Sequence, residues 1–174
     1  MSDPLLQQML DYKEIIELKA RFARTADARD WEGFREVFHS EGRFDFGGGY
    51  VVEGGDAFVA EVVAQLDGGR SLHRFILPEI NITSATEATG EWVLNDYIEW
   101  APDPVTGERR GFQGFAREYE IYRKIDGAWK IAGWRVHYER MDPLPRAPLP
   151  DTILGGPAVL QDAEYLAAVT ERAG

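Results

Sequence analysis

The chain has 174 residues, of which 44% are hydrophobic and 28% charged, a composition typical of one globular domain rather than of a disordered segment. Its formal net charge of −11 opposes contact with phosphate backbones and anionic lipid, so neither nucleic acid nor a membrane is an expected partner. There is no cysteine, which excludes disulfides, thiol catalysis and thiolate metal sites. The first ten residues lack the basic and apolar segments of a signal peptide, and a cytoplasmic location is therefore expected.

The first expected element is an amphipathic helix over residues 12–27. Apolar side chains fall on one broad arc of the helical wheel, and mostly charged ones fall on the other. Lys19 and Asp27 break this pattern, because both lie inside the apolar arc. A lysine can extend its ammonium to water along an apolar stem, which is a simple explanation of Lys19. Aspartate is too short for this, so Asp27 needs another explanation.

Two shorter helices are expected next. Each follows an aspartate, a residue type whose side chain accepts hydrogen bonds from the N–H groups of a first helical turn. They cover residues 31–38 after Asp30 and residues 57–66 after Asp56. The run Gly47, Gly48 and Gly49 between them lacks the Lys and Ser or Thr of a phosphate loop, so we predict a turn or bulge there.

From residue 71 the hydrophobic period changes to two, which is typical of strands. Strands are expected over residues 71–85, 88–101, 111–125 and 128–141, and Asp126-Gly127 is the strongest hairpin signal among their connections. Helices followed by such a meander predict an α+β fold, with three N-terminal helices packed on a curved, mainly antiparallel sheet. Residues 1–140 are expected to form this domain. Residues 141–174 are expected to be a proline-rich arm with a terminal helix, not a separate domain.

His73 has a setting that suggests chemistry. Strand alternation places it with Phe75 and Leu77, so its imidazole is expected to line an enclosed apolar space. No histidines have the spacing of a metal site, and no metal is expected. An imidazole is a natural partner for Asp27, because a carboxylate on one ring nitrogen makes the other nitrogen more basic. Alternatively, Asp27 accepts backbone N–H bonds in the turn that follows it; residue physics alone leaves these two interpretations level.

Three segments resemble the SnoaL-like branch of the NTF2-like superfamily. They read EIIELKARFARTADARDW, LHRFILPEINI and IDGAWKIAGWRV, and the resemblance extends over residues 9–140. It implies a cone-shaped fold, catalysis without a cofactor, and a homo-oligomer, either a dimer or a trimer.

Within this branch, the scytalone dehydratase, bile acid 7α-dehydratase and lindane dehydrochlorinase group uses a His-Asp pair to move a proton during an elimination. The resemblance assigns these catalytic roles to His73 and Asp27. The chain departs from the group elsewhere, because Phe22 and, approximately, Phe46 stand where the group has pocket tyrosines. The group's pocket arginine falls near Trp134 or Tyr138. Candidate polar replacements on the strands are Asn95, Tyr97, Tyr119 and Tyr138.

Aromatic side chains favour a pocket for a flat or polycyclic apolar substrate. The expected substrate-binding residues are Phe22, Phe46, Tyr50, Trp92, Trp134 and Tyr138. The leading hypothesis is a lyase or isomerase of the dehydratase or cyclase type, acting on a small hydrophobic cyclic molecule. A non-catalytic small-molecule-binding or scaffolding protein is the alternative. The resemblance also allows a small subunit of a ring-hydroxylating dioxygenase, which requires an iron-containing partner; for epoxide hydrolysis, no Asp-Arg-Asp arrangement is evident on these strands.

Overall fold

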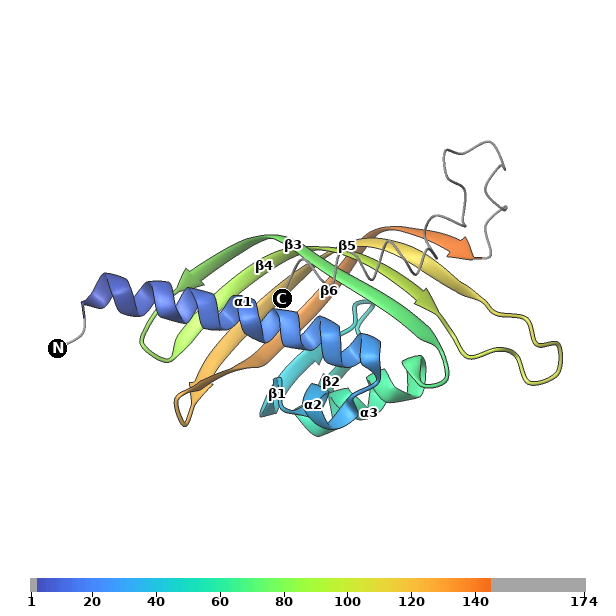
Figure 1. Ribbon diagram of the computed structural model, residues 1–174, viewed down its shortest axis with the longest axis horizontal. Helices are drawn as coiled ribbons and strands as arrows, with labels where there is room; N and C mark the ends of the chain where they lie inside the picture. Colours follow the sequence, from blue (N-terminus) through green and yellow to red (C-terminus); the bar gives the residue numbers. More distant parts are fainter. Residues whose placement is uncertain (1–2, 145–174) are drawn as a thin grey trace, which may run out of the picture.

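A long helix lies across one face of a curved sheet, and two short helices lie beside its C-terminal end (Figure 1). The computed structural model describes residues 3–144; the predicted C-terminal helix falls outside them. The helices are α1 (Pro4–Ala28), α2 (Trp31–Arg35) and α3 (Gly55–Leu66). The strands are β1 (Phe38–Asp45), β2 (Val51–Glu53), β3 (Arg70–Ile82), β4 (Glu87–Glu99), β5 (Gly111–Ile125) and β6 (Ala128–Leu144).

The six strands form one sheet in the order β2-β1-β6-β5-β4-β3. Strands β3 to β6 are the predicted antiparallel meander, and β1 joins its β6 edge in parallel. The expected α+β class, with N-terminal helices on a curved sheet, is confirmed. Strand β6 runs to Leu144, although its Pro143 predicted irregular structure. Pro143 pairs with Phe112 of β5 beyond the end of β1, where no other strand within residues 3–144 needs its N–H.

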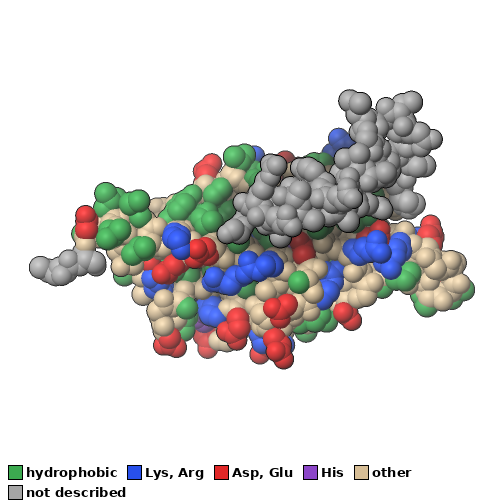
Figure 2. Space-filling view, in the orientation of Figure 1, with side chains coloured by type: hydrophobic (Ala, Val, Ile, Leu, Met, Phe, Trp, Pro, Cys, Tyr) green, Lys and Arg blue, Asp and Glu red, His purple; other side chains and the backbone are tan. Residues whose placement is uncertain are grey.

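Helix α1 begins at Pro4, well before the amphipathic stretch that predicted it. The Asp3 side chain accepts a hydrogen bond from the backbone of Leu5 at 2.9 Å and caps the helix. Apolar side chains at this end, including Met9, are exposed, and Figure 2 shows hydrophobic surface over this part of the molecule. The helix ends at Ala28, and the next residue, Arg29, caps it in a left-handed conformation with φ 60°. None of the helices in the described part of the chain has the length and apolarity that a bilayer crossing demands.

The turns follow the sequence closely, with three exceptions near the helices and β3. Residues 47–49 all have positive φ and form the predicted turn, as do Asp126 and Gly127. Helix α3 begins at Gly55 with Gly54 as its N-cap and no side-chain cap, so Asp56 lies within the first turn and does not cap the helix as expected. The helix predicted over residues 31–38 ends at Arg35 instead, because β1 begins at Phe38 and packs that residue into the core. Leu77 was expected to face inward with His73, but it sits at a β-bulge with φ 51° and is 74% exposed.

The core lies between the helices and the concave face of the sheet, and it is rich in phenylalanine. Phe22 of α1 packs edge-to-face on Phe34 and Phe38, with ring centroids 5.2 and 5.6 Å apart. Lys19 also belongs to this interior, because it is only 1% exposed. The expectation that its ammonium reaches water is therefore wrong.

Candidate active site

The last turn of α1 brings Asp27 against His73 of β3. The His73 Nδ1 and the Asp27 Oδ1 are 2.7 Å apart, and the His73 backbone N–H donates to Asp27 Oδ2 at 2.9 Å. Both carboxylate oxygens are thus directed at one residue of the neighbouring strand. The turn after α1 does not use this carboxylate, since the Arg29 and Asp30 N–H groups donate to the backbone oxygens of Ala26 and Thr25. The structure therefore brings the two predicted catalytic residues into direct contact.

Two further residues hold the carboxylate in place. The Ser71 hydroxyl donates to Asp27 Oδ1 at 2.8 Å, and Arg29 Nη1 donates to Ser71 Oγ at 2.7 Å. The guanidinium occupies the hydroxyl oxygen, so the hydroxyl proton is directed at Asp27. Burial alone raises the pKa of Asp27, but the hydrogen bonds and charge of His73, with the Ser71 hydroxyl, outweigh it and hold that pKa below its usual value. Asp27 is therefore ionised at neutral pH.

His73 borders a cavity of about 370 Å³ between the helices and the sheet. This volume is at the lower end of the range for small-molecule sites. Aromatic and aliphatic side chains form most of the wall, and four of the predicted substrate-binding residues are among them: Phe22, Phe46, Trp134 and Tyr138. The structure places the other two elsewhere. Tyr50 is 48% exposed beside Phe46. Trp92 donates its indole N–H to the Tyr122 hydroxyl and lines a second space, together with Asp27 and His73.

Asp96 is a polar residue of this cavity that the sequence did not single out. It pairs with His73 across β3 and β4, which brings the two side chains next to each other on the concave face. The Tyr138 hydroxyl donates to Asp96 Oδ2 at 2.5 Å, whereas the buried Oδ1 has no hydrogen-bond partner within residues 3–144. Burial raises the pKa of Asp96 more than Tyr138 and His73 lower it. Asp96 is thus suited to carry a proton beside the imidazole.

A signal for Asp96 does exist in the sequence. In β4 it alternates with Trp92, Leu94 and Ile98, all buried, so it shares their face. Asn95 and Tyr97, two of the sequence-based candidates for a polar replacement, are on the opposite face. A single acid within an apolar face is the same signal that drew attention to Asp27.

The profile of the SnoaL-like domain family matches residues 7–135. The chain belongs to this family. The resemblance stated from the three sequence segments is therefore confirmed.

Three solved structures are similar to this SnoaL-like domain. A presumed scytalone dehydratase from Novosphingobium aromaticivorans has 17% identity and a TM-score of 0.69, with 84% of this chain and 96% of that chain covered. A hexachlorocyclohexane dehydrochlorinase (LinA-type3) from Novosphingobium barchaimii has 15% identity and a TM-score of 0.68, covering 83% and 97%. A protein of unknown function from Mycobacterium tuberculosis has 24% identity and a TM-score of 0.64, covering 98% and 94%. At these identities the likeness shows a shared fold and not a shared reaction.

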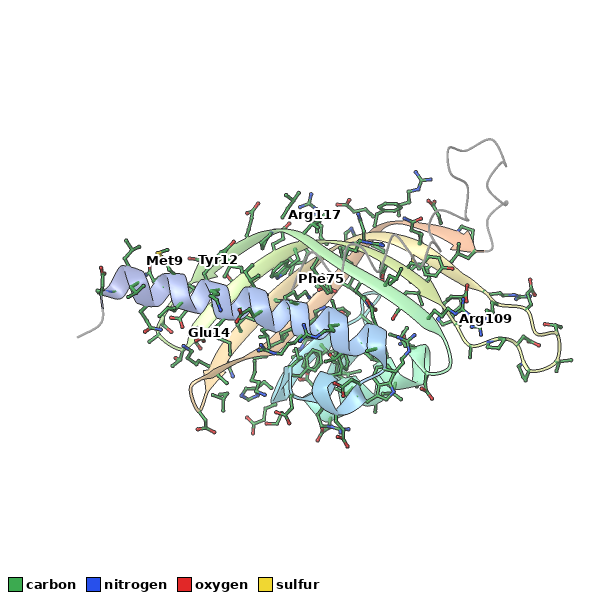
Figure 3. All side chains as sticks on the ribbon, viewed as in Figure 1. Met9, Tyr12, Glu14, Phe75, Arg109 and Arg117 are labelled. Atoms are coloured by element: carbon green, nitrogen blue, oxygen red, sulfur yellow. The ribbon has the colours of Figure 1, made fainter. Side chains whose placement is uncertain are left out.

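The SnoaL-like domain also has a groove on the other side of the dyad, between α1 and β3. Asp27 and His73 both line this groove, together with Phe75, which Figure 3 shows between the helix and the sheet. His73 therefore contacts two separate spaces, the cavity and the groove. No group of three or more metal-ligating side chains occurs within residues 3–144.

Proposed function

We propose that this SnoaL-like domain is a cofactor-independent lyase or isomerase, of the dehydratase or cyclase type, which acts on a small hydrophobic cyclic molecule with His73 as general base. The observation that carries the proposal is the 2.7 Å contact of His73 Nδ1 with Asp27 at the wall of an apolar cavity. A general base needs both a partner that fixes its tautomer and access to the substrate, and His73 has both.

The proton moves in the following way. Asp27 accepts the Nδ1–H, so the lone pair of Nε2 is free; no residue in the described part of the chain hydrogen-bonds to Nε2. Nε2 removes a proton from a ring carbon next to a carbonyl group or a leaving group, and His73 becomes an imidazolium that Asp27 stabilises. In an isomerisation, the imidazolium returns the proton to another carbon of the same molecule.

Asp96 supplies the acid that elimination requires. The role falls to it because Phe22 has no hydroxyl where related dehydratases carry a tyrosine. When a carbon–oxygen bond breaks, the protonated Asp96 transfers its proton to the leaving hydroxyl, which departs as water, and the new double bond forms from the electrons of the broken C–H bond. Afterwards the imidazolium gives its proton back to the Asp96 carboxylate, directly or through solvent. Tyr138 holds Asp96 in position throughout, by its 2.5 Å hydrogen bond.

The named activity of one structural neighbour supports an elimination at a ring. The LinA-type3 protein is a hexachlorocyclohexane dehydrochlorinase and shares the fold. The alternative, a non-catalytic binding protein, is favoured by Phe22, because this phenylalanine leaves the aromatic wall without the tyrosine hydroxyl of the dehydratases.

Hydrogen–deuterium exchange tests the base without knowledge of the natural substrate. With 1-tetralone in D₂O, we expect the wild type to accelerate exchange at the carbon next to the carbonyl, as followed by NMR. His73→Ala should lose this acceleration by about 10²-fold or more, the usual contribution of a general base. His137→Ala, an exposed histidine on β6, is the matched control and should exchange like the wild type. Equal rates in the wild type and His73→Ala would refute the proposal, and binding without any acceleration would favour the non-catalytic alternative.

A further inference from the structure

A buried ion cluster lies behind the wall of the cavity and reaches it through one glutamate, and the proposed reaction does not use this cluster. Lys19 of α1 bonds to both Glu118 and Glu120 of β5, with Nζ 2.5 Å from Glu120 Oε1. The Lys19 and carboxylate side chains are at most 2% exposed. Lys19 Nζ also lies 3.7 Å from the ring centroid of Phe75, so its remaining surroundings are aromatic.

The charges of this cluster balance only if one carboxyl group is neutral. One ammonium faces two carboxyl groups in a dry interior, where an unpaired ionised carboxylate is strongly unfavourable. Glu120 accepts hydrogen bonds from Lys19 and from the Tyr122 hydroxyl, as suits a carboxylate. Burial raises the pKa of Glu118, although Lys19 opposes this. Glu118 is therefore the member of the pair that keeps a proton.

Only Glu118 of the two borders the cavity. Its position relative to Asp96 follows from the pairing of β4 with β5, in which Asp96 lies opposite Gly114 and Trp92 opposite Glu118. The Cα atoms of residues 114 and 118 are about 13 Å apart, because each residue of a strand advances it by about 3.3 Å. Hydrogen bonds of about 2.7 Å at each end leave about 8 Å, which suits two oxygens on opposite ends of two fused six-membered rings.

We propose that Glu118 determines substrate specificity, by donating a hydrogen bond to an oxygen at one end of an uncharged fused-ring substrate whose other end lies at His73 and Asp96. The inference rests on the proposed function for the assignment of the reacting end. We infer that the substrate is uncharged from the ionisable groups that line the cavity. They are His73, Asp96, Glu118 and Tyr138, and no lysine or arginine of residues 3–144 is among the lining residues. A carboxylate or phosphate on the ring system would meet two carboxyl groups and no cation.

Three naphthalene probes test the proposal by calorimetric titration. 2,6-Dihydroxynaphthalene has an oxygen at each end, 2-naphthol has one oxygen, and 6-hydroxy-2-naphthoate replaces one hydroxyl with an anion. We expect the wild type to bind the diol about fivefold more tightly than 2-naphthol, the equivalent of about 1 kcal/mol for one hydrogen bond. The naphthoate should bind at least tenfold more weakly than the diol.

Variants then assign the preference to Glu118. Glu118→Met should bind the diol and 2-naphthol equally well, whereas Glu118→Gln keeps an N–H donor and should retain the preference. Glu139→Gln, a change at an exposed glutamate of β6 outside the cavity wall, is the matched control and should bind the three probes as the wild type does. A fivefold preference that survives in Glu118→Met would overturn the proposal. The proposal would also be overturned if the wild type bound 2-naphthol or 6-hydroxy-2-naphthoate as tightly as the diol. This comparison uses the wild type alone.

The same titrations separate this inference from the proposed reaction. In His73→Ala, the preference for the diol should persist even though deuterium exchange is lost. If the wild type shows the binding preference but never accelerates exchange, only the proposed reaction fails. If exchange is accelerated but Glu118→Met leaves the preference unchanged, only the role of Glu118 fails.

Discussion

Replacing Lys19 with methionine should destabilise the fold far more than removing an ordinary surface lysine. Methionine fills a similar volume but leaves Glu118 and Glu120 without a cation in an interior where both are at most 2% exposed. Removal of one partner from a buried ion pair costs about 3–5 kcal/mol. In a domain of this size 1 kcal/mol corresponds to about 2–4 °C, so we expect the melting temperature of Lys19→Met to fall by about 6–20 °C at pH 8.

The deficit should also depend on pH, with a definite sign. Burial already raises the pKa of Glu118 in the folded state, and loss of Lys19 raises it further. The folded variant then binds more protons than the unfolded chain, so its stability falls as the pH rises. Relative to the wild type, Lys19→Met should lose little below about pH 4.3, the ordinary glutamate pKa, and progressively more above it.

Urea denaturation and thermal melts of matched variants check this reasoning. Lys13→Met removes an exposed lysine that pairs with Glu17 one turn along the same helix, and it should melt like the wild type. The double variant Lys19→Met/Glu120→Gln removes the stranded charge together with the cation and should recover most of the loss. A Lys19→Met protein as stable as the wild type at pH 8, or a deficit that is the same at pH 4.5 and pH 8, would refute the account of the cluster.

Three further predictions concern the site. Asp27→Asn should slow deuterium exchange by about 10²–10⁴-fold with little change in circular dichroism, because the amide has no negative charge to stabilise the imidazolium, and its NH₂ in place of Oδ2 cannot accept from the His73 backbone N–H. Asp96→Asn should abolish elimination. Asp96→Asn should also stabilise the protein at high pH, because burial raises the pKa of Asp96 in the folded state. The contribution of Asp96 to stability is complete below its unfolded pKa and is lost as the pH rises through its folded pKa. The melting temperatures of the two proteins should therefore diverge with increasing pH. Gly114→Ala places a Cβ 2.1 Å from Asp96 Oδ1 and 2.5 Å from Tyr138 Cε1. It should separate Asp96 from Tyr138, reduce elimination and lower the free energy of unfolding by about 1–3 kcal/mol. Gly133→Ala is the control and should be active, because its Cβ meets the Ile121 side chain at 3.1 Å.

The dyad was predictable from a local signal together with the family resemblance. An acid inside an apolar arc requires a partner, but residue physics left an imidazole and the backbone of the next turn level, and the resemblance pointed to His73, which the structure places 2.7 Å from Asp27. The pocket aromatics were only partly predictable, since single residues such as Trp92 and Tyr50 meet the same compositional test whether they line a cavity, fill the core or lie on the surface.

The buried cluster was not predictable in the same way, because its members meet only in the folded chain. Lys19 and its partners are about a hundred positions apart. Strand β5 adds to the difficulty: Tyr119 and Ile121 are exposed, while Glu118 and Glu120 face the core. Hydrophobicity alone would assign Tyr119 and Ile121 to the core face of this strand and the two glutamates to solvent. The buried ammonium explains the inversion, since it makes the inner face the favourable place for the carboxyl groups.

The dyad separates two spaces, and this gives the proton and the substrate different routes to solvent. In the proposed reaction the cavity holds the ring, whereas the groove between α1 and β3 reaches the same Asp27 and His73 from outside. A proton taken from the substrate can therefore exchange with bulk water while the ring stays bound. In D₂O, an isomerised product should therefore carry solvent deuterium after a single binding event. The deuterium content should be higher when turnover is slow compared with proton exchange at the His73 imidazole.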